Sequence, residues 1–314
     1  MQEDPLLIDT SNIKRDALEK KHSFAYSVGH FSNDLCAAGW FFYFTYYLKY
    51  VIKMDGGQAG LVMLAGQIAD GCTTPLVGLL SDKCKTPLGS RAPWYIIGTM
   101  IVLPCFFCIF LSPMGVGNPN INPGDADPDI TTGKVAFYIA MASLFNVGWA
   151  SVQIANMSVV NSITYSTQKR DTLVASRNTF TLIANIAVLV TSLILFNITS
   201  ITSEVQFRIL GSIIVGVGLV SSLTYMIVLK EPYLSKEAKR LYKEFKLQQT
   251  ELYKAEEGEK VRAKSMSMQV KSWTAWFKES QFYVYGIVYT MVRMAVNVVM
   301  TVQSLYLIEV LGFE

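Results

Sequence analysis

Seven apolar stretches follow one another along the chain, each about as long as a helix that crosses a bilayer. Such a helix needs about 20 mostly apolar residues. Polar residues interrupt the fourth and the seventh stretch. The pattern predicts an all-α polytopic membrane protein whose spans run near residues 24–48, 58–80, 94–112, 135–158, 176–199, 208–229 and 281–310.

Composition supports this prediction and excludes other classes. Hydrophobic residues make up 51% of the chain and charged residues only 16%, whereas a soluble domain carries roughly 25% charged residues. A soluble enzyme, a nucleic-acid-binding module and a disordered chain are therefore excluded. No catalytic GxSxG, HExxH or phosphate-loop motif occurs. Cys105 and Cys108 have CxxC spacing, but the chain lacks the second CxxC that would pair with it in a metal site. We expect no enzyme activity, no cofactor, no metal and no nucleic-acid partner, and we interpret the cysteines as small buried residues.

Loop charges predict the orientation in the membrane. Basic loops remain in the cytosol. The segment 230–279 carries 12 basic and 8 acidic residues, and the loops after the second and fourth stretches are also basic. The loop 113–134, on the opposite side, holds three aspartates against one lysine. The N-terminus is therefore expected in the cytosol.

The same pattern predicts four regions. They are a cytosolic tail (1–23), an N-terminal six-helix half (24–229), a cytosolic linker (230–279) and the first helix of a second half (280–314). The linker has helical charge patterning without a wide apolar stripe, which favours a solvated connecting helix over a dedicated docking site.

Polar and charged residues recur on single faces of five of the seven stretches. A charge inside the bilayer costs a few kcal/mol or more, so it usually faces a bundle interior or a wet cavity. The third and sixth stretches hold no charge or amide over 94–112 and 209–229, so both could face lipid all round. The candidate substrate and coupling residues are Asp34, Gln67, Asp70, Trp149, Gln153, Arg177, Arg293 and Asn297.

Structural roles remain open for these residues. Asp34, Asp70 and Arg293 could form ion pairs between helices, and Arg177 could extend its charge to the membrane surface. His30 lies four residues before Asp34, so it could either relay a proton or only satisfy that carboxylate.

Several of these residues belong to longer motifs that resemble a known family. The segments 29–34, 66–78 and 89–94 resemble the glycoside–pentoside–hexuronide branch of the major facilitator superfamily. The resemblance implies two six-helix halves, of which this chain would hold the first and one helix of the second, with five helices missing. It also implies that residues 78–91, here called the gating loop, favour one gate state through a charged clasp between Asp82 and Arg91, with glycines such as Gly78 and Gly89 permitting turns.

A closer resemblance, over 31–38, 148–153 and 282–297, is to superfamily members that import cysteine into lysosomes and melanosomes. It implies a secondary active transporter or facilitator of cysteine or a related amino acid, with the bilayer, a small solute and a coupling proton as partners. Sodium-coupled sugar symporters of the branch carry carboxylates where this chain has Thr74 and Asn146, which disfavours sodium and sugar. A sugar:cation symporter and a non-transporting truncated membrane protein remain the alternatives.

The N-terminal tail contains a candidate sorting signal. Glu3 stands four residues before the pair Leu7-Ile8, which resembles the dileucine sorting signal that clathrin adaptors read. Together with the resemblance, the motif favours a lysosomal or related membrane over the plasma membrane.

Overall fold

The computed structural model describes residues 18–122, 124–257 and 277–311. The chain divides into two compact units, residues 1–243 and 244–314, and each is treated by itself. The tail motif of Glu3, Leu7 and Ile8 lies outside the described residues, so the sorting signal stays a prediction.

The first apolar stretch is helical but interrupted. It comprises α1 (Lys20–Gly29), α2 (Phe31–Gly39) and two π-helical turns, η2 (Trp40–Phe44) and η3 (Tyr47–Val51). His30 forms the turn between α1 and α2, and the N–H of Asp34 still donates to the His30 carbonyl at 3.0 Å. π-Helical turns are rare and occur frequently at functional sites. In this stretch they follow the part of the helix that carries His30 and Asp34.

Five long helices complete the first unit. Asp55 caps one of them through hydrogen bonds from Gly57 and Gln58, and Thr131 caps another by accepting from Lys134 N–H. Such caps satisfy N–H groups that a helix start leaves unpaired. The five are α3 (Gly56–Lys83), α4 (Ala92–Leu111), α5 (Thr132–Ile163), α6 (Thr167–Phe196) and α7 (Ser203–Val228).

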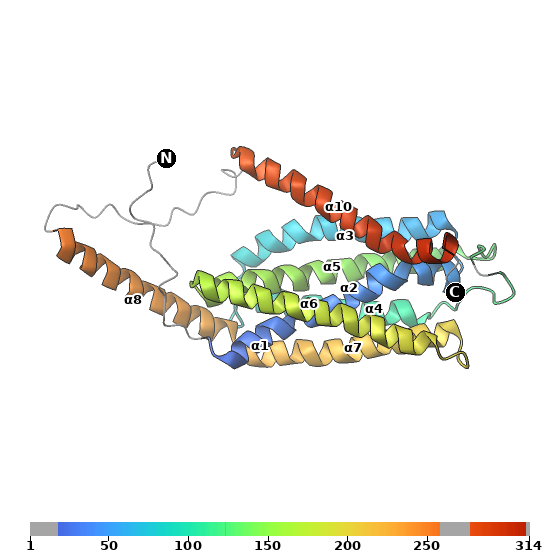
Figure 1. Cartoon of the computed structure of the whole chain (residues 1–314), viewed down its shortest axis with the longest axis horizontal. Coiled ribbons are helices and arrows are strands. Elements are labelled where there is room, and N and C mark those ends of the chain that lie inside the picture. The colour runs from blue at the N-terminus through green and yellow to red at the C-terminus, as the bar shows by residue number, and fades with distance from the viewer. Residues whose placement is uncertain (1–17, 123, 258–276, 312–314) are drawn as a thin grey trace. The chain divides into compact units, whose positions relative to one another are not determined.

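The helices of this unit run lengthwise beside one another (Figure 1). α5 packs against both α3 and α4, whereas α2 packs against α6 and α7. Gly98 of α4 and Gly148 of α5 allow a close approach of the two backbones, because a Cβ on Gly148 would lie 2.9 Å from the Gly98 carbonyl oxygen. Small residues at such contacts are typical of membrane helix packing.

Within the described residues, five helices are long and apolar enough to cross a membrane: α4, α5, α6, α7 and Ser280–Met300 of the last helix. The first stretch is broken into short pieces, and α3 falls outside this group. The expectation that the third and sixth stretches face lipid all round is wrong. In the most apolar segment of α4, 50% of the residues are buried, and in that of α7 33% are buried. Both helices pack against other helices of the unit.

The cysteines also differ in part from expectation. All five are free, but only Cys36 and Cys105 are buried, while Cys72 is exposed and Cys84 and Cys108 are half-buried. Cys72 is exposed because α3 makes its main contacts along one side, against α5.

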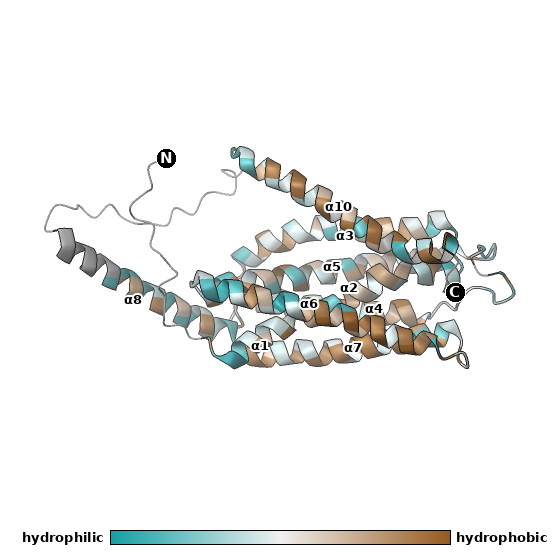
Figure 2. Cartoon of the chain, viewed as in Figure 1, coloured by the Kyte–Doolittle hydropathy of each residue, from teal (hydrophilic) through white to brown (hydrophobic). Residues whose placement is uncertain are grey.

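The remaining helices are α8 (Glu231–Glu257) and α10 (Ser280–Glu309). Figure 2 shows hydrophobic residues along α6 and α7, with hydrophilic ones at the start of α6 and along the coloured part of α8. The predicted linker helix is thus present, but full solvation is wrong for its first turns. Leu234 is 0% exposed and Ala238 5%, because residues spaced by three and four fall on one helical face.

Candidate functional site

The Asp34 carboxylate is the centre of a buried polar cluster. Its Oδ1 lies 2.9 Å from Nδ1 of His30, and its Oδ2 accepts a hydrogen bond of 2.9 Å from the Thr181 hydroxyl. The side chains of His30 and Asp34 are each only 8% exposed. Burying a carboxylate costs much free energy unless hydrogen bonds satisfy it, so these two contacts are what allow Asp34 to lie inside the bundle.

The cluster belongs to a longer interface between the first helical stretch and α6. The Ser27 hydroxyl donates to that of Ser176 at 2.8 Å, and the Phe31 and Phe180 rings meet edge to face at 6.0 Å. The Thr181 contact continues this row: Asp34 lies about one turn after Phe31 on α2, and Thr181 directly follows Phe180 on α6. The row fixes the register of α2 against α6 and brings Thr181 to Asp34.

Two neighbours of Asp34 keep buried polar atoms without a hydrogen-bond partner in the described structure. They are Nε2 of His30 and both amide atoms of Asn33, and Asn33 is only 1% exposed. An unsatisfied buried polar group costs about 1–3 kcal/mol. Natural proteins tolerate such costs mainly where function requires the group, so this segment can offer hydrogen bonds to a bound molecule.

Asp70, Gln67, Trp149 and Gln153 lie on the α3 and α5 pair. Asp70 accepts a hydrogen bond of 3.2 Å from the Thr74 hydroxyl, and both Asp70 and Gln67 are half-buried. Trp149 is buried, its ring 5.9 Å from that of Phe41, and Gln153 is half-buried.

Close packing beside Gln67 positions this second group. A Cβ on Gly66 would lie 2.6 Å from the Asn146 side chain and 3.3 Å from the Trp40 ring, so only glycine allows α3 to approach this closely. The structure thus joins Asp34 to α6 and places Asp70 on the helix that packs on α5. That Asp34 and Asp70 belong to one substrate and coupling site stays a prediction.

Arg177 is half-buried, and its guanidinium donates to the Asn178 side chain at 3.1 Å. Its Nε is buried without a partner in the described structure. These contacts leave open both a ligand role and a position near the membrane surface.

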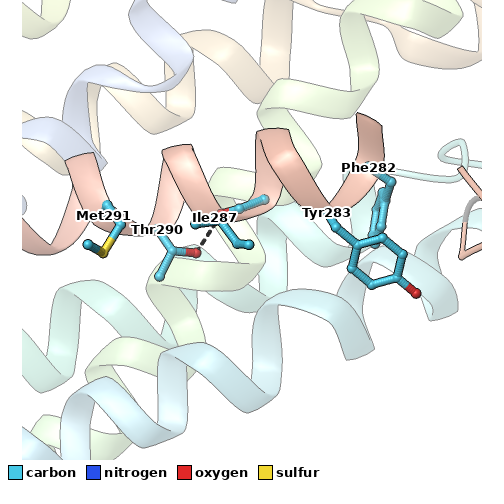
Figure 3. Close-up of a pocket in the computed structure, with 6 residues that line it drawn as sticks. Phe282, Tyr283, Ile287, Thr290 and Met291 are labelled. Carbon is cyan, nitrogen blue, oxygen red and sulfur yellow. Dashed lines mark hydrogen bonds between the residues drawn. The ribbon is translucent and has the colours of Figure 1, made fainter. Parts of the chain in front are cut away.

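Arg293 and Asn297 lie on α10, in the second unit. Asn297 is half-buried, and the Arg293 side chain lies outside what the structure describes. A hollow of about 270 Å³ runs along α10 beside Phe282, Tyr283 and Met291 (Figure 3). One helix supplies all of its lining, and the Thr290 hydroxyl at its wall donates to the carbonyl of Gly286 at 2.8 Å. The hollow is therefore a groove between side chains of one helix.

The gating loop contains the predicted clasp. The Arg91 guanidinium pairs with Asp82 and donates to the Ser81 hydroxyl at 3.0 Å. Gly89 has φ +111°, a left-handed conformation that favours glycine, whereas Gly78 lies inside α3 with open space where a Cβ would lie. Sequence reasoning missed a further member, Glu231, whose carboxylate accepts hydrogen bonds from the backbone of this loop. Glu231 is one of eight acidic residues in the segment 230–279, so nothing in the sequence distinguished it as a residue that contacts this loop.

The loop between α4 and α5 is organised around Asp127. Its carboxylate accepts hydrogen bonds of 2.9 Å from the backbone N–H groups of Asn118 and Asp129, and these bonds hold the pKa of Asp127 below its usual value. Lys53, which follows the first helical stretch, also binds this loop: its ammonium group donates to the carbonyl of Ile121 at 2.6 Å.

Comparison with known proteins identifies the family. A family model described as MFS/sugar transport protein matches residues 25–255. Major facilitator superfamily domain-containing protein 12 of Homo sapiens is 32% identical over 303 residues, which cover 90% of this chain and 58% of that protein. The protein of the same name from Equus caballus is 31% identical over 309 residues, 93% of this chain and 60% of that protein.

A more distant relative is an uncharacterized symporter of Synechocystis, 27% identical over 232 residues, 71% of this chain and 41% of that protein. The chain thus spans 58–60% of the length of the two animal relatives. The family consists of transporters, which confirms the expectation that the chain is not an enzyme. By the match over residues 25–255 and the identity to the animal relatives, the chain belongs to the MFS/sugar transport protein family and is a multi-pass membrane protein of the major facilitator superfamily.

Proposed function

We propose that this chain forms the substrate- and proton-handling part of a transporter for cysteine or a related small amino acid in a lysosome-type membrane. The observation that carries the proposal is the buried Asp34 carboxylate, held by His30 and Thr181 next to polar atoms of Asn33 that have no partner in the described structure. An intramembrane carboxylate with unsatisfied polar neighbours is the expected signature of a solute or proton pathway.

The His30–Asp34 pair is suited to carry a coupling proton. Nδ1 of His30 and Oδ1 of Asp34 lie 2.9 Å apart in a buried site, which is within reach of a direct proton transfer between them. Protonating the pair changes its charge inside the bundle and weakens the hold of Asp34 on Thr181. Proton binding would thereby be linked to the packing of α2 on α6.

The amino-acid substrate is supported by the charges that the chain offers. A zwitterion needs an anion for its ammonium group, supplied by Asp34 or Asp70, and a cation for its carboxylate, supplied by Arg177. Arg293, in the second unit, stays a candidate from the sequence. Thr74, which stands where sodium-coupled symporters of the branch carry a carboxylate, already donates to Asp70. This arrangement favours a proton over sodium as the coupling ion.

Uptake of labelled cysteine into vesicles tests the proposal. Asp34→Asn and Asp70→Asn should each reduce uptake about tenfold or more, equivalent to about 1.4 kcal/mol, at unchanged protein abundance. Asp125→Asn, in the exposed loop between α4 and α5, is the matched control and should leave uptake unchanged. Normal uptake with either intramembrane substitution would remove that residue from the transport site.

Two alternatives give different results in the same vesicles. A sugar:cation symporter, favoured by the similarity to the Synechocystis symporter, would accumulate a labelled disaccharide in response to a sodium gradient and ignore cysteine. A non-transporting protein would move neither solute. To separate that outcome from an incomplete bundle, the chain is also tested after fusion to the remaining residues of the Homo sapiens relative, since it covers 58% of that protein.

The lysosomal location has its own test. Replacing Leu7 and Ile8 with alanine in a tagged protein should send it to the cell surface, because the adaptor would lose both apolar contacts. Retention of this variant in acidic vesicles would show that the sorting signal lies elsewhere in the chain.

A further inference from the structure

Glu231, the first residue of α8, is buried at the start of α4. It is only 4% exposed, although it belongs to a charged helix. Its carboxylate accepts hydrogen bonds from three successive backbone N–H groups, those of Ser90 at 3.0 Å, Arg91 at 3.1 Å and Ala92 at 2.8 Å. α4 begins at Ala92 without a cap from the side chain that precedes it. Glu231 therefore supplies, from about 140 residues away in sequence, the anion that a helix start requires.

The gating loop is shaped to receive this carboxylate. Gly89 turns the chain at φ +111°, and a Cβ at this position would lie 2.4 Å from Oε2 of Glu231. The turn is closed by the Gly89 N–H, which donates to the Thr86 carbonyl at 3.0 Å, and by the Thr86 hydroxyl, which donates to the Gly89 carbonyl at 2.6 Å. Both the backbone conformation and the space therefore require glycine.

The same segment connects Glu231 to the charged clasp. Glu231 holds the backbone of Arg91, while the Arg91 side chain pairs with Asp82 and donates to Ser81 at 3.0 Å. Asp82 is 68% exposed at its side chain, so its pair with Arg91 is screened and weak by itself. The hydrogen bonds to the buried Glu231 carboxylate are charge-assisted and shielded from water, so they hold the loop more strongly than the Asp82–Arg91 pair does.

The first turns of α8 are themselves anchored. Leu234 and Ala238 are buried, and the Tyr242 ring stacks on that of Tyr165 at 4.5 Å. Glu231 is thus presented by a helix with a fixed position on the first unit.

We propose that Glu231 is a positioning residue of the gating loop: it holds Ser90–Ala92 in place so that Arg91 can pair with Asp82, and thereby ties the loop to the linker helix. The consequence for gating rests on the proposed transport function. A movement of α8 that withdraws Glu231 releases the start of α4 and the clasp together.

The chain contains its own reporter of this contact. Cys84 is half-buried between α3 and the turn of the gating loop, whereas Cys36 is fully buried in α2. In a variant whose other three cysteines are replaced by alanine, the rate of labelling by a water-soluble maleimide is measured at both thiols. Glu231→Gln should accelerate labelling of Cys84 about tenfold, because one acceptor oxygen and the charge are lost, while Cys36 stays protected.

Glu237→Gln is the matched control, because Glu237 lies less than two turns further along the same helix and pairs with Arg240 within it. Equal labelling of Cys84 in the two variants would overturn the proposal. Labelling of Cys36 together with Cys84 would also overturn it, because Glu231 would then hold the whole bundle instead of the loop. Transport is not measured here, so a failure of the proposed function leaves this result intact.

Gly89→Ala provides a second, independent perturbation. The added methyl group displaces the carboxylate, so Cys84 labelling should rise as in Glu231→Gln, and the double variant should rise no further. Additive acceleration would show that the two residues act separately and would contradict the proposed contact.

Discussion

Replacing Thr181 with valine removes one contact of the buried Asp34 carboxylate while keeping the volume of the side chain. The lost bond is the 2.9 Å donation from the Thr181 hydroxyl to Asp34 Oδ2; the same hydroxyl also donates to the Arg177 carbonyl of its own helix at 3.3 Å. Thr179→Val is the matched control. Its hydroxyl only donates to the Ala175 carbonyl of the same helix, at 3.2 Å, so the difference between the variants isolates the contact with Asp34.

The magnitude follows from the burial and the charge. Polar contacts between membrane helices contribute about 0.6 kcal/mol on average and up to about 1.7, whereas hydrogen bonds to charged groups contribute about 1.5–3 kcal/mol. Because the Asp34 side chain is 8% exposed, we expect the upper part of the first range. Thr181→Val should lower the free energy of unfolding by about 1–1.7 kcal/mol more than Thr179→Val does.

Equilibrium unfolding of the chain in mixed detergent micelles measures this difference, and the cycle is completed in an Asp34→Asn background. There the extra cost of Thr181→Val should shrink, because the acceptor has lost its charge. Equal destabilisation by the two valine variants, or an unchanged cost in the Asp34→Asn background, would refute the contact as the element that joins α2 to α6.

Three further results are expected. Gly148→Ala should lower stability by about 1–3 kcal/mol, because its Cβ would meet the Gly98 carbonyl at 2.9 Å, whereas Gly216→Ala, in open space, should not; equal thermal unfolding of both would contradict the packing of α4 on α5. Ala126→Cys, exposed between α4 and α5, should react only with a reagent on the non-cytosolic side, and labelling from the cytosol would reverse the orientation. Because the pKa of Asp127 is lowered by the backbone N–H groups that it binds, its stabilisation is fully present above its ordinary value and is lost as the pH falls through the lowered one. Hydrogen exchange of those amides should therefore stay protected from about pH 7 down to about pH 4.5, and loss of protection near pH 6 would show that the carboxylate does not hold the loop.

The sequence by itself determined the helical stretches and the residues that share one face of each. Hydrophobic periodicity reports on a helix and its faces directly, so the polar rows containing Asp34 and Asp70 were predictable, and charge patterning predicted the helix at 231–257. The Asp82–Arg91 clasp was also accessible, because the resemblance places its two members in one short loop.

Tertiary structure alone decided which helices meet. Thr181 reaches Asp34 across 147 residues and Glu231 reaches the start of α4 across about 140, and periodicity contains no information about such neighbours. The same limit explains why α4, uniformly apolar in sequence, is half buried. An apolar residue can face either lipid or another helix at similar cost, so only the packed bundle distinguishes the two, and in this protein it does so through the glycine contact between α4 and α5.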